Sequence, residues 1–355
     1  MKVSVQLLLA VACCAGLNLD VSRCSAEKPN SRAAASKDIQ TAVEAGLKYL
    51  DEQGQWWLDT KKCVSCHRTA FVSWALWSAD RRGLKVSADD LTRWQTANLK
   101  DPGGKGNLEG LSQLILGRVP DPIPTDSVAA ENSVDLKEGP AAYNDFAQLL
   151  IENQQPNGSW KAGGQLPRQY RPVEETNEVS TMWNLLALES LQPTDARKQA
   201  IQKAREFLKT AIDASDATPR KSSEWYALTV TLHSSSDRPE GLQKAVDRLL
   251  ALQNDDGGWG WLAGETSHAM STGLALYFLS QSPASAEPKV AAATQKAAAW
   301  LLSTQTDDGT WPSTGTKSNA KGKVVETATY WSSAWAVLGL LETLPPQSSV
   351  AAIPE

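Results

Sequence analysis

The stretch Gln253-Asn254-Asp255-Asp256-Gly257-Gly258-Trp259 decides the fold of this 355-residue chain. Two variants of the unit occur elsewhere, as Gln155-Pro156-Asn157-Gly158-Ser159-Trp160 and Gln305-Thr306-Asp307-Asp308-Gly309-Thr310-Trp311. An Asn or Asp before Gly is typical of a chain reversal with positive φ at the end of a helix. The glutamine can bond backbone groups left open at the helix end, and the tryptophan can cover the turn. A unit repeated in this way predicts a repetitive fold.

Amphipathic segments precede these turns and apolar segments follow them. The segment 199–208 carries Lys, Arg and Glu on one face, whereas 271–280 is small and apolar. Comparing the chain with itself gives six such pairs, and no strand-like alternation competes with them. The pairs are 38–53 with 67–82, 88–99 with 107–118, 138–154 with 177–191, 196–212 with 222–235, 239–253 with 267–281, and 287–305 with 326–344.

Six amphipathic helices outside and six apolar helices inside predict an all-α protein, an (α/α)6 toroid over residues 38–345. We expect a signal peptide at 1–26, a flexible linker at 27–37 and a disordered tail at 346–355. In the first pair, Gln55-Trp56-Trp57 is expected to form the turn. Inner-helix entrances would then converge on one rim of a central cavity. The expected lining of that cavity is Trp74, Trp183, Trp225 and Trp331.

The first 26 residues are typical of an export signal. Lys2 gives a short positive start, and Val5 to Leu17 is an apolar run too short to span a bilayer permanently. Cys13 and Cys14 lack a leucine-led lipobox, so we expect a periplasmic or secreted protein rather than a lipoprotein. The formal net charge of −5 gives no electrostatic case for binding nucleic acid or an anionic membrane.

The run Cys63-Val64-Ser65-Cys66-His67 has the spacing of a c-type haem attachment site. Two thiols three positions apart can each add across a vinyl group of one porphyrin, and the histidine can then ligate the iron. The remaining cysteines, Cys13, Cys14 and Cys24, all lie in the expected leader. Covalent haem attachment takes place outside the bacterial inner membrane, so export and motif agree. We expect one haem c, anchored by Cys63 and Cys66 with His67 on the iron.

Two other uses of the same thiols stay open. Cys63 and Cys66 could form a disulfide in an oxidising compartment. They could also bind zinc if His233 or His268 were brought in from elsewhere in the chain.

The repeat register also suggests the sixth iron ligand. In the repeat register, His67 of the first pair aligns with His268 and Met270 of the fifth pair and with Met182 of the third. We expect Met270 to close the distal side, because a thioether raises the potential of a single-haem electron carrier. A helix-capping role for His268 and a core role for Met270 are the alternatives. Lys61, Lys62 and Arg68 are near enough in sequence to neutralise haem propionates.

The Gln/Gly/Trp turns resemble the QW motifs of squalene-hopene cyclases and the related repeat of protein prenyltransferases. The resemblance covers residues 138–344 well and 38–82 more loosely, and it implies an α/α toroid. Cyclases that protonate an alkene carry Asp-x-Asp-Asp-Thr at an inner-helix start, where this chain has Asn177, His268 and Thr329 in register. Proteins that combine such repeats with Cys-x-x-Cys-His look most similar overall.

These observations favour an exported haem-binding toroid in electron transfer or redox sensing, with a redox partner protein and a hydrophobic ligand in the central cavity. Three alternatives stay open. One is a cyclase- or prenyltransferase-like enzyme acting on a polyprenyl or triterpenoid substrate. Another is a carbohydrate-active toroid, a lyase or glycosidase, with Glu175, Glu265 and Glu326 around the cavity mouth. The third is a non-catalytic interaction module. The sequence identifies no catalytic residue.

Overall fold

The computed structural model describes residues 29–61, 66–100, 107–118, 139–162, 171–214, 222–234, 239–315 and 322–345. The helices in these ranges are α1 Pro29–Lys61, α2 Phe71–Arg81, α3 Ala88–Lys100, α4 Leu108–Leu116, α5 Gly139–Glu152, α6 Val173–Glu189, α7 Asp195–Ala214, α8 Ser223–Ser234, α9 Pro239–Leu250, α10 Ala269–Gln281, α11 Pro288–Thr304 and α12 Glu326–Thr343. A π-helical turn, η1 Cys66–Ala70, precedes α2, and a 3-10 turn, η3 Pro283–Ala286, precedes α11. No described helix is long and apolar enough to cross a membrane.

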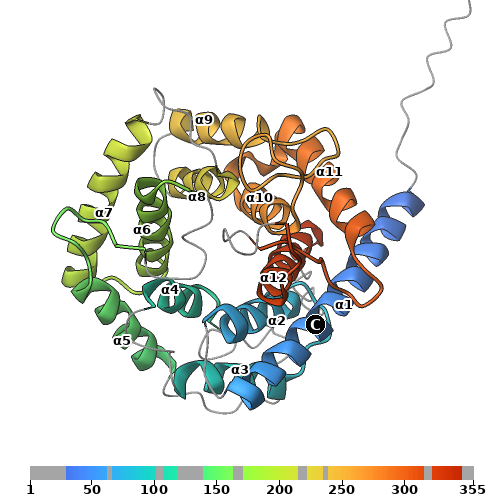
Figure 1. Ribbon diagram of the computed structural model, residues 1–355, viewed down its shortest axis with the longest axis horizontal. Coiled ribbons are helices and arrows are strands. Elements are labelled where there is room, and N and C mark those ends of the chain that lie inside the picture. Colours follow the sequence, from blue (N-terminus) through green and yellow to red (C-terminus); the bar gives the residue numbers. More distant parts are fainter. Residues whose placement is uncertain are drawn as a thin grey trace, which may run out of the picture.

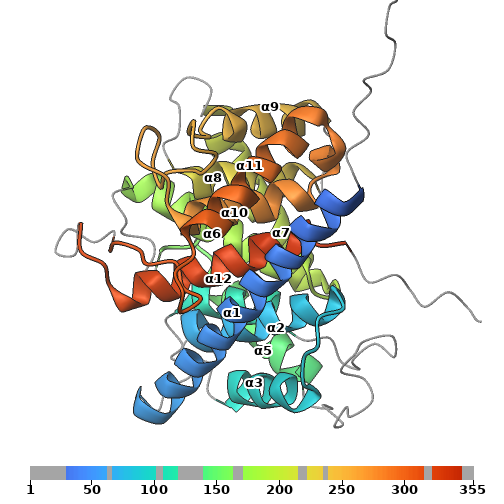
Figure 2. The same cartoon turned by 90° about the vertical axis from the view of Figure 1, so that its right-hand side faces the viewer.

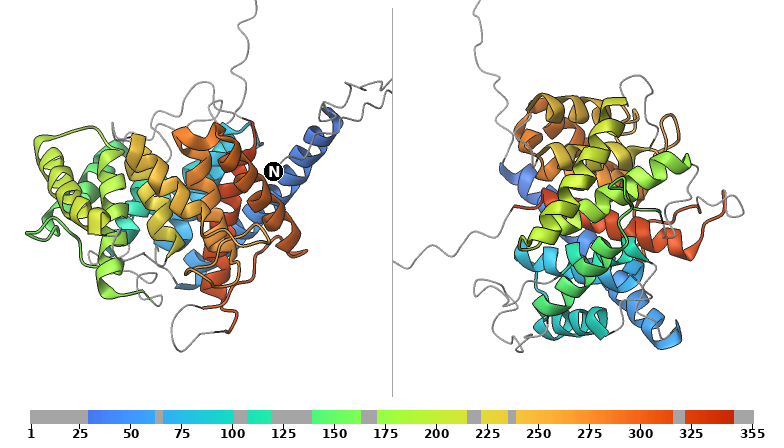
Figure 3. Two further views of the ribbon diagram at one scale, coloured as in Figure 1. Left: turned by 90° about the horizontal axis from the view of Figure 1, so that it is seen from above. Right: turned by 90° about the vertical axis from the view of Figure 1, so that its left-hand side faces the viewer.

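The helices form two concentric rings (Figure 1). The odd-numbered helices lie outside and the even-numbered helices inside, so each predicted pair is one helical hairpin. The last hairpin returns to the first, and α1 packs beside α12 (Figure 2). Figure 3 shows the same ring of helices edge-on from two further sides. The predicted (α/α)6 toroid is confirmed.

Inner helices are buried on nearly all sides because the outer ring covers them. In α10, every residue from Ala269 to Leu279 is buried. Small residues allow α10 and α12 to approach closely: a Cβ at Gly273 would collide with the carbonyl of Trp335, and one at Gly339 with the carbonyl of Gly273. The small, apolar composition of these segments therefore reflects contact between backbones.

Each predicted turn is a brace that connects three helices. Gln253 Nε2 donates to the Gly257 carbonyl at 2.8 Å and to Ala293 of α11 at 2.9 Å. Trp259 Nε1 donates to the carbonyl of Leu249 in α9 at 2.8 Å, and its backbone N–H donates to Thr272 Oγ1 of α10 at 2.9 Å. The turn therefore fixes its own outer helix, the next outer helix and its own inner helix.

The other two turns repeat these bonds, with one correction to the register. Gln154, not the predicted Gln155, donates to Gly158 and to Ala200 of α7, because it lies six positions before Trp160, as Gln253 lies before Trp259. Gln305 donates to Ala42 of α1 at 2.9 Å and so closes the ring. The turn glycines have φ of 88° (Gly158), 93° (Gly257) and 79° (Gly309), as predicted.

Two predictions about the N-terminal hairpin are wrong. Gln55-Trp56-Trp57 does not form a turn, because α1 continues to Lys61. Gly54 lies inside the helix, where a Cβ would press on the Trp94 ring, and Trp94 Nε1 donates to Asp51 at 2.7 Å to connect α3 to α1. Residues 29–37, expected as a linker, belong to α1, since the run 33–35 is alanine, the best helix former. The expected signal peptide and tail lie outside the described residues.

Candidate functional site

The haem motif leads directly into the first inner helix. Cys66 and His67 begin the π-turn η1, which continues into α2 at the entrance that the repeat register predicted. Cys63 lies outside the described residues, as do the side chains of Cys66 and His67. Single π-helical turns are rare and occur frequently at functional sites.

Arg68, the residue after the motif, is completely buried. Its guanidinium lies over the rings of Tyr330 at 4.3 Å and Trp57 at 5.0 Å, and it pairs with Glu326. The Tyr330 hydroxyl donates to the Arg68 carbonyl at 2.7 Å and to the Leu50 carbonyl at 3.2 Å. Burial raises the pKa of Tyr330, which keeps the phenol protonated as a donor. Helices α1 and α12 therefore hold the turn from two sides.

This arrangement changes the expected role of the nearby cations. Arg68 is turned into the protein and paired with Glu326, so it is not a propionate partner as the sequence suggested. Lys61 is exposed at the end of α1, with its ammonium 5.8 Å from the centroid of Trp56 and 6.0 Å from that of Trp57. Lys61 remains the candidate partner for a haem propionate. Lys62 lies outside the described residues.

Aromatic side chains fill the middle of the ring. The ring of Trp335 lies 5.4 to 6.1 Å from five others, and its residue is 1% exposed. Those five neighbours are Phe71, Trp74, Trp183, Tyr277 and Phe278. Two of the four tryptophans predicted to line a central cavity, Trp74 and Trp183, belong to this packed cluster.

Two buried glutamates on neighbouring inner helices form a crossed pair with tryptophans. Glu178 of α6 accepts from Trp225 Nε1 of α8 at 2.8 Å, and Glu224 of α8 accepts from Trp183 Nε1 of α6 at 2.9 Å. Glu224 also pairs with Arg171 at 2.7 Å. Sequence pattern alone does not predict this cluster, because helix-start glutamates are common and their tryptophan partners are distant in sequence.

The three glutamates that the sequence placed around the cavity mouth brace loops. Glu175 accepts from the Ser222 backbone N–H at 3.3 Å, across to the next hairpin. Glu265 accepts from the Leu262 N–H at 3.2 Å within its own loop, and Glu326 pairs with Arg68. Glu175 and Glu326 thus each connect two neighbouring hairpins.

The positions of the cyclase acid motif are also used for bracing. Asn177 Oδ1 accepts from the Ala162 N–H at 3.0 Å, and Thr329 Oγ1 accepts from the Ser313 N–H at 3.1 Å. Each bond fixes the backbone two residues after a brace tryptophan. In this chain the inner-helix start therefore supports the loop instead of presenting an acid.

His268 precedes α10, but its side chain makes no capping bond, contrary to the capping interpretation. Burial lowers its pKa to about 4, and an interaction with the Thr314 backbone offsets only part of this, so the imidazole is neutral at pH 7. Met270 is 3% exposed and Met182 is fully buried in the apolar core. The distal-ligand role of Met270 stays a prediction. Within the described ranges, no three His, Cys, Asp or Glu side chains gather as a metal site.

Comparisons with known proteins establish the fold and leave the reaction open. No protein-family model matches the chain, and no curated protein does. A possible GH105 family member from Salmonella enterica serovar Paratyphi A has a TM-score of 0.54 at 13% identity, covering 87% of this chain and 94% of its own. A type II terpene cyclase variant from Scytonema, bound to merosterolic acid A, has a TM-score of 0.55 at 14% identity, covering 88% and 99%. A polysaccharide lyase has a TM-score of 0.50 at 9% identity, covering 87% and 97%.

These likenesses are structural. The chain has the α/α toroid fold.

Proposed function

We propose that this toroid is exported and carries one covalent haem c at its rim, for electron transfer or redox sensing. The observation that carries the proposal is Cys63-x-x-Cys66-His67 at the entrance of an inner helix. Cys63 and Cys66 would anchor the group and His67 would ligate the iron, while Arg68 and Tyr330 hold the turn that begins with Cys66 and His67. When bound, the haem would supply one-electron exchange.

The surroundings of the motif fit an apolar group with acidic substituents. Two of the three exposed large apolar side chains in the described ranges belong to the two helices that hold the turn or to the loop before one of them: Trp56 of α1 is 44% exposed, and Val324, before α12, is 62% exposed. Trp56 lies beside Lys61, and Val324 is two positions before Glu326, the partner of Arg68. Because the ring centre is packed, the group would lie on the rim, against this apolar surface and the Lys61 ammonium.

Haem content tests the proposal directly. The full chain, expressed with c-type maturation machinery, should keep haem through denaturing electrophoresis and give a c-type pyridine haemochrome spectrum. The double variant Cys63→Ser, Cys66→Ser should lose it, whereas Ser65→Ala, a change inside the motif at a position without an assigned role, should keep it. A wild type without haem, or equal haem in the double variant, contradicts the proposal.

The structural comparisons favour a second candidate function, an enzyme acting on carbohydrate or terpenoid, and they support it better than the first. The similar structures include a possible glycosidase-family member, a lyase and a terpene cyclase. The crossed pair Glu178 and Glu224 provides two carboxyl groups on adjacent inner helices, the kind of pair that glycoside hydrolysis uses. Their indole and guanidinium partners would hold them in place.

Reducing-end release from a panel of polysaccharides and oligosaccharides tests this second function. Activity that disappears in Glu178→Gln or Glu224→Gln would support it. Glu189→Gln is the matched control, because Glu189 lies at the opposite end of α6, where it pairs with Arg205. Absence of activity in the wild type, or activity unchanged in both variants, would exclude this pair from catalysis.

A further inference from the structure

The Gln/Gly/Trp brace connects three pairs of neighbouring outer helices. The turns after α5, α9 and α11 each bond to the next outer helix, and Trp94 connects α3 to α1 by a different bond. After α7, the sequence 213–222 contains no glutamine, glycine or tryptophan, the three residue types of the brace. The joint between α7 and the α8–α9 pair is therefore one that this brace does not span.

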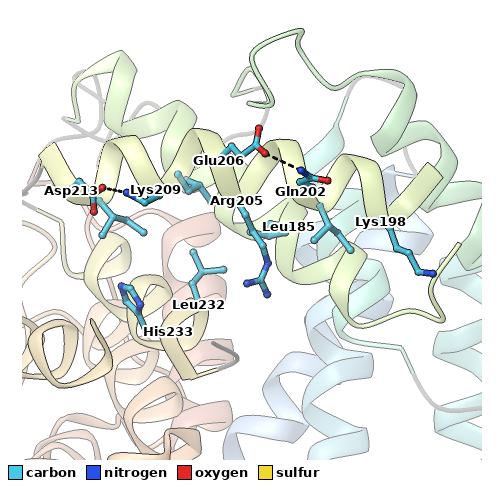
Figure 4. Close-up of a pocket in the computed structure, with 12 residues that line it drawn as sticks. Leu185, Lys198, Gln202, Arg205, Glu206, Lys209, Asp213, Leu232 and His233 are labelled. Carbon is cyan, nitrogen blue, oxygen red and sulfur yellow. Dashed lines mark hydrogen bonds and ion pairs between the residues drawn. The ribbon is translucent and has the colours of Figure 1, made fainter. Parts of the chain in front are cut away.

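A groove of about 480 Å³ lies at this joint, within the range of about 300–1,000 Å³ that is typical of small-molecule sites. It is formed by α7 with Leu185 of α6 and with Leu232 and His233 of α8 (Figure 4). His233 in turn packs against α9, since a Cβ at Gly241 would lie 2.6 Å from its Nδ1 atom. Helices α7 and α8 therefore form the two walls of the groove.

The shape and lining of the groove suit a linear aliphatic chain. Its lining on α7 extends from Lys198 to Asp213, about 22 Å at 1.5 Å per residue. Five lining residues are aliphatic and none is aromatic. The aliphatic residues are Leu185, Ile201, Leu208, Ile212 and Leu232.

The charges along α7 favour an anionic end on that chain. The helix has five basic and three acidic residues, a net charge of +2, in a chain whose formal net charge is −5. Among the lining cations, Arg205 pairs with Glu189 and Lys209 with Asp213. The side chain of Lys198 is 64% exposed, and the carboxylate that it faces, Asp195, lies 3.8 Å away and is 97% exposed. Such a pair contributes little, so Lys198 can turn to another anion.

We propose that this groove binds a linear aliphatic molecule with a single anionic head, of the fatty-acid class. The aliphatic chain would lie along Ile201, Ile212 and Leu232, and the head would lie at Lys198. This places the hydrophobic ligand that the sequence suggested on the outer wall, because aromatic rings occupy the ring centre. The inference does not depend on haem binding.

Fluorescence titration of the purified full chain with cis-parinaric acid, followed by competition with palmitate, tests the proposal. We expect saturable binding that Ile201→Gln weakens about tenfold, the effect of losing one buried aliphatic contact. Ile212→Gln is the second variant if the first fails to fold by circular dichroism. Lys198→Glu should weaken the binding of palmitate several-fold and leave the binding of hexadecanol unchanged. Lys203→Glu is the control, an exposed lysine of α7 outside the groove.

Three results would overturn the proposal. These are titration without saturation, binding insensitive to both isoleucine substitutions, and equal loss in Lys198→Glu and Lys203→Glu. Hexadecanol binding as tightly as palmitate would refute the assigned head group.

Discussion

Replacing Trp311 by alanine should destabilise the ring where it closes. Trp311 is 1% exposed, and its Nε1 atom donates to the Leu301 carbonyl at 2.9 Å. Its backbone N–H donates to Ser333 of α12 at 3.1 Å, and its ring lies where a Cβ on Gly46 of α1 would contact it at 3.3 Å. One side chain therefore contacts the last hairpin and the first helix.

The expected cost follows from these contacts. Truncating a buried large aromatic costs about 3–5 kcal/mol, through lost transfer free energy and the cavity left behind. The milder Trp311→Phe keeps an aromatic ring but removes one donor from the Leu301 carbonyl, which still accepts from the Gln305 backbone N–H at 3.2 Å, so it should cost about 0.5–1.5 kcal/mol. Trp259→Ala removes the equivalent buried ring and its bond to the Leu249 carbonyl of α9, and should cost about the same as Trp311→Ala.

Chemical denaturation followed by far-UV circular dichroism measures these differences. Trp56→Ala is the matched control: Trp56 is 44% exposed on α1, and its loss should change the unfolding free energy by about 0.5 kcal/mol or less. If Trp311→Ala and Trp56→Ala shifted the midpoint equally, the brace would not be the closure of the ring.

Three further predictions concern residues at the starts of the inner helices. Glu326→Gln should lower the free energy of unfolding by about 1–3 kcal/mol, because it leaves the Arg68 guanidinium buried without a counter-charge. Arg68→Met should leave the free energy of unfolding almost unchanged. Equal denaturation midpoints for the two variants would contradict this. The His268 pKa of about 4 lies below the ordinary 6.5, so the unfolded chain binds more protons between these values. The free energy of unfolding should fall as pH drops from 6.5 to 4, and it should fall less in His268→Asn. Parallel pH profiles for the wild type and this variant would refute the role given to His268. Squalene incubated with the protein should give no polycyclic product in a lipid extract, since Asn177 and Thr329 stand where an acid is needed.

The fold could be predicted because its repeating signal is local. The brace needs a glutamine, a glycine with positive φ and a tryptophan within seven positions, all of which are visible in one stretch such as 253–259. Gln55-Trp56-Trp57 imitates part of this signal without a following glycine, so the helix continued through it. Gly54 precedes it and serves helix packing against Trp94 instead.

The site was less predictable because its contacts join distant parts of the chain. The motif around Cys66 could be recognised from spacing alone, whereas the burial of Arg68 depends on Trp57 and Tyr330 from opposite ends of the sequence. The same applies to the bonds from Trp225 to Glu178 and from Trp183 to Glu224. Sequence pattern shows that such residues face inward, and only the ring geometry shows which of them meet.

The packed centre restricts where this toroid can do chemistry. An open ring would place ligands among the inner helices, but here Trp335 and its aromatic neighbours occupy that space and the helix starts are used to brace loops. Two of the surfaces in the described ranges are the rim beside the motif, with exposed Trp56, and the groove along α7. Because the two lie on different hairpins, a substitution in the groove such as Ile201→Gln should leave haem content unchanged. Loss of haem in that variant would mean that the hairpins are coupled through the ring.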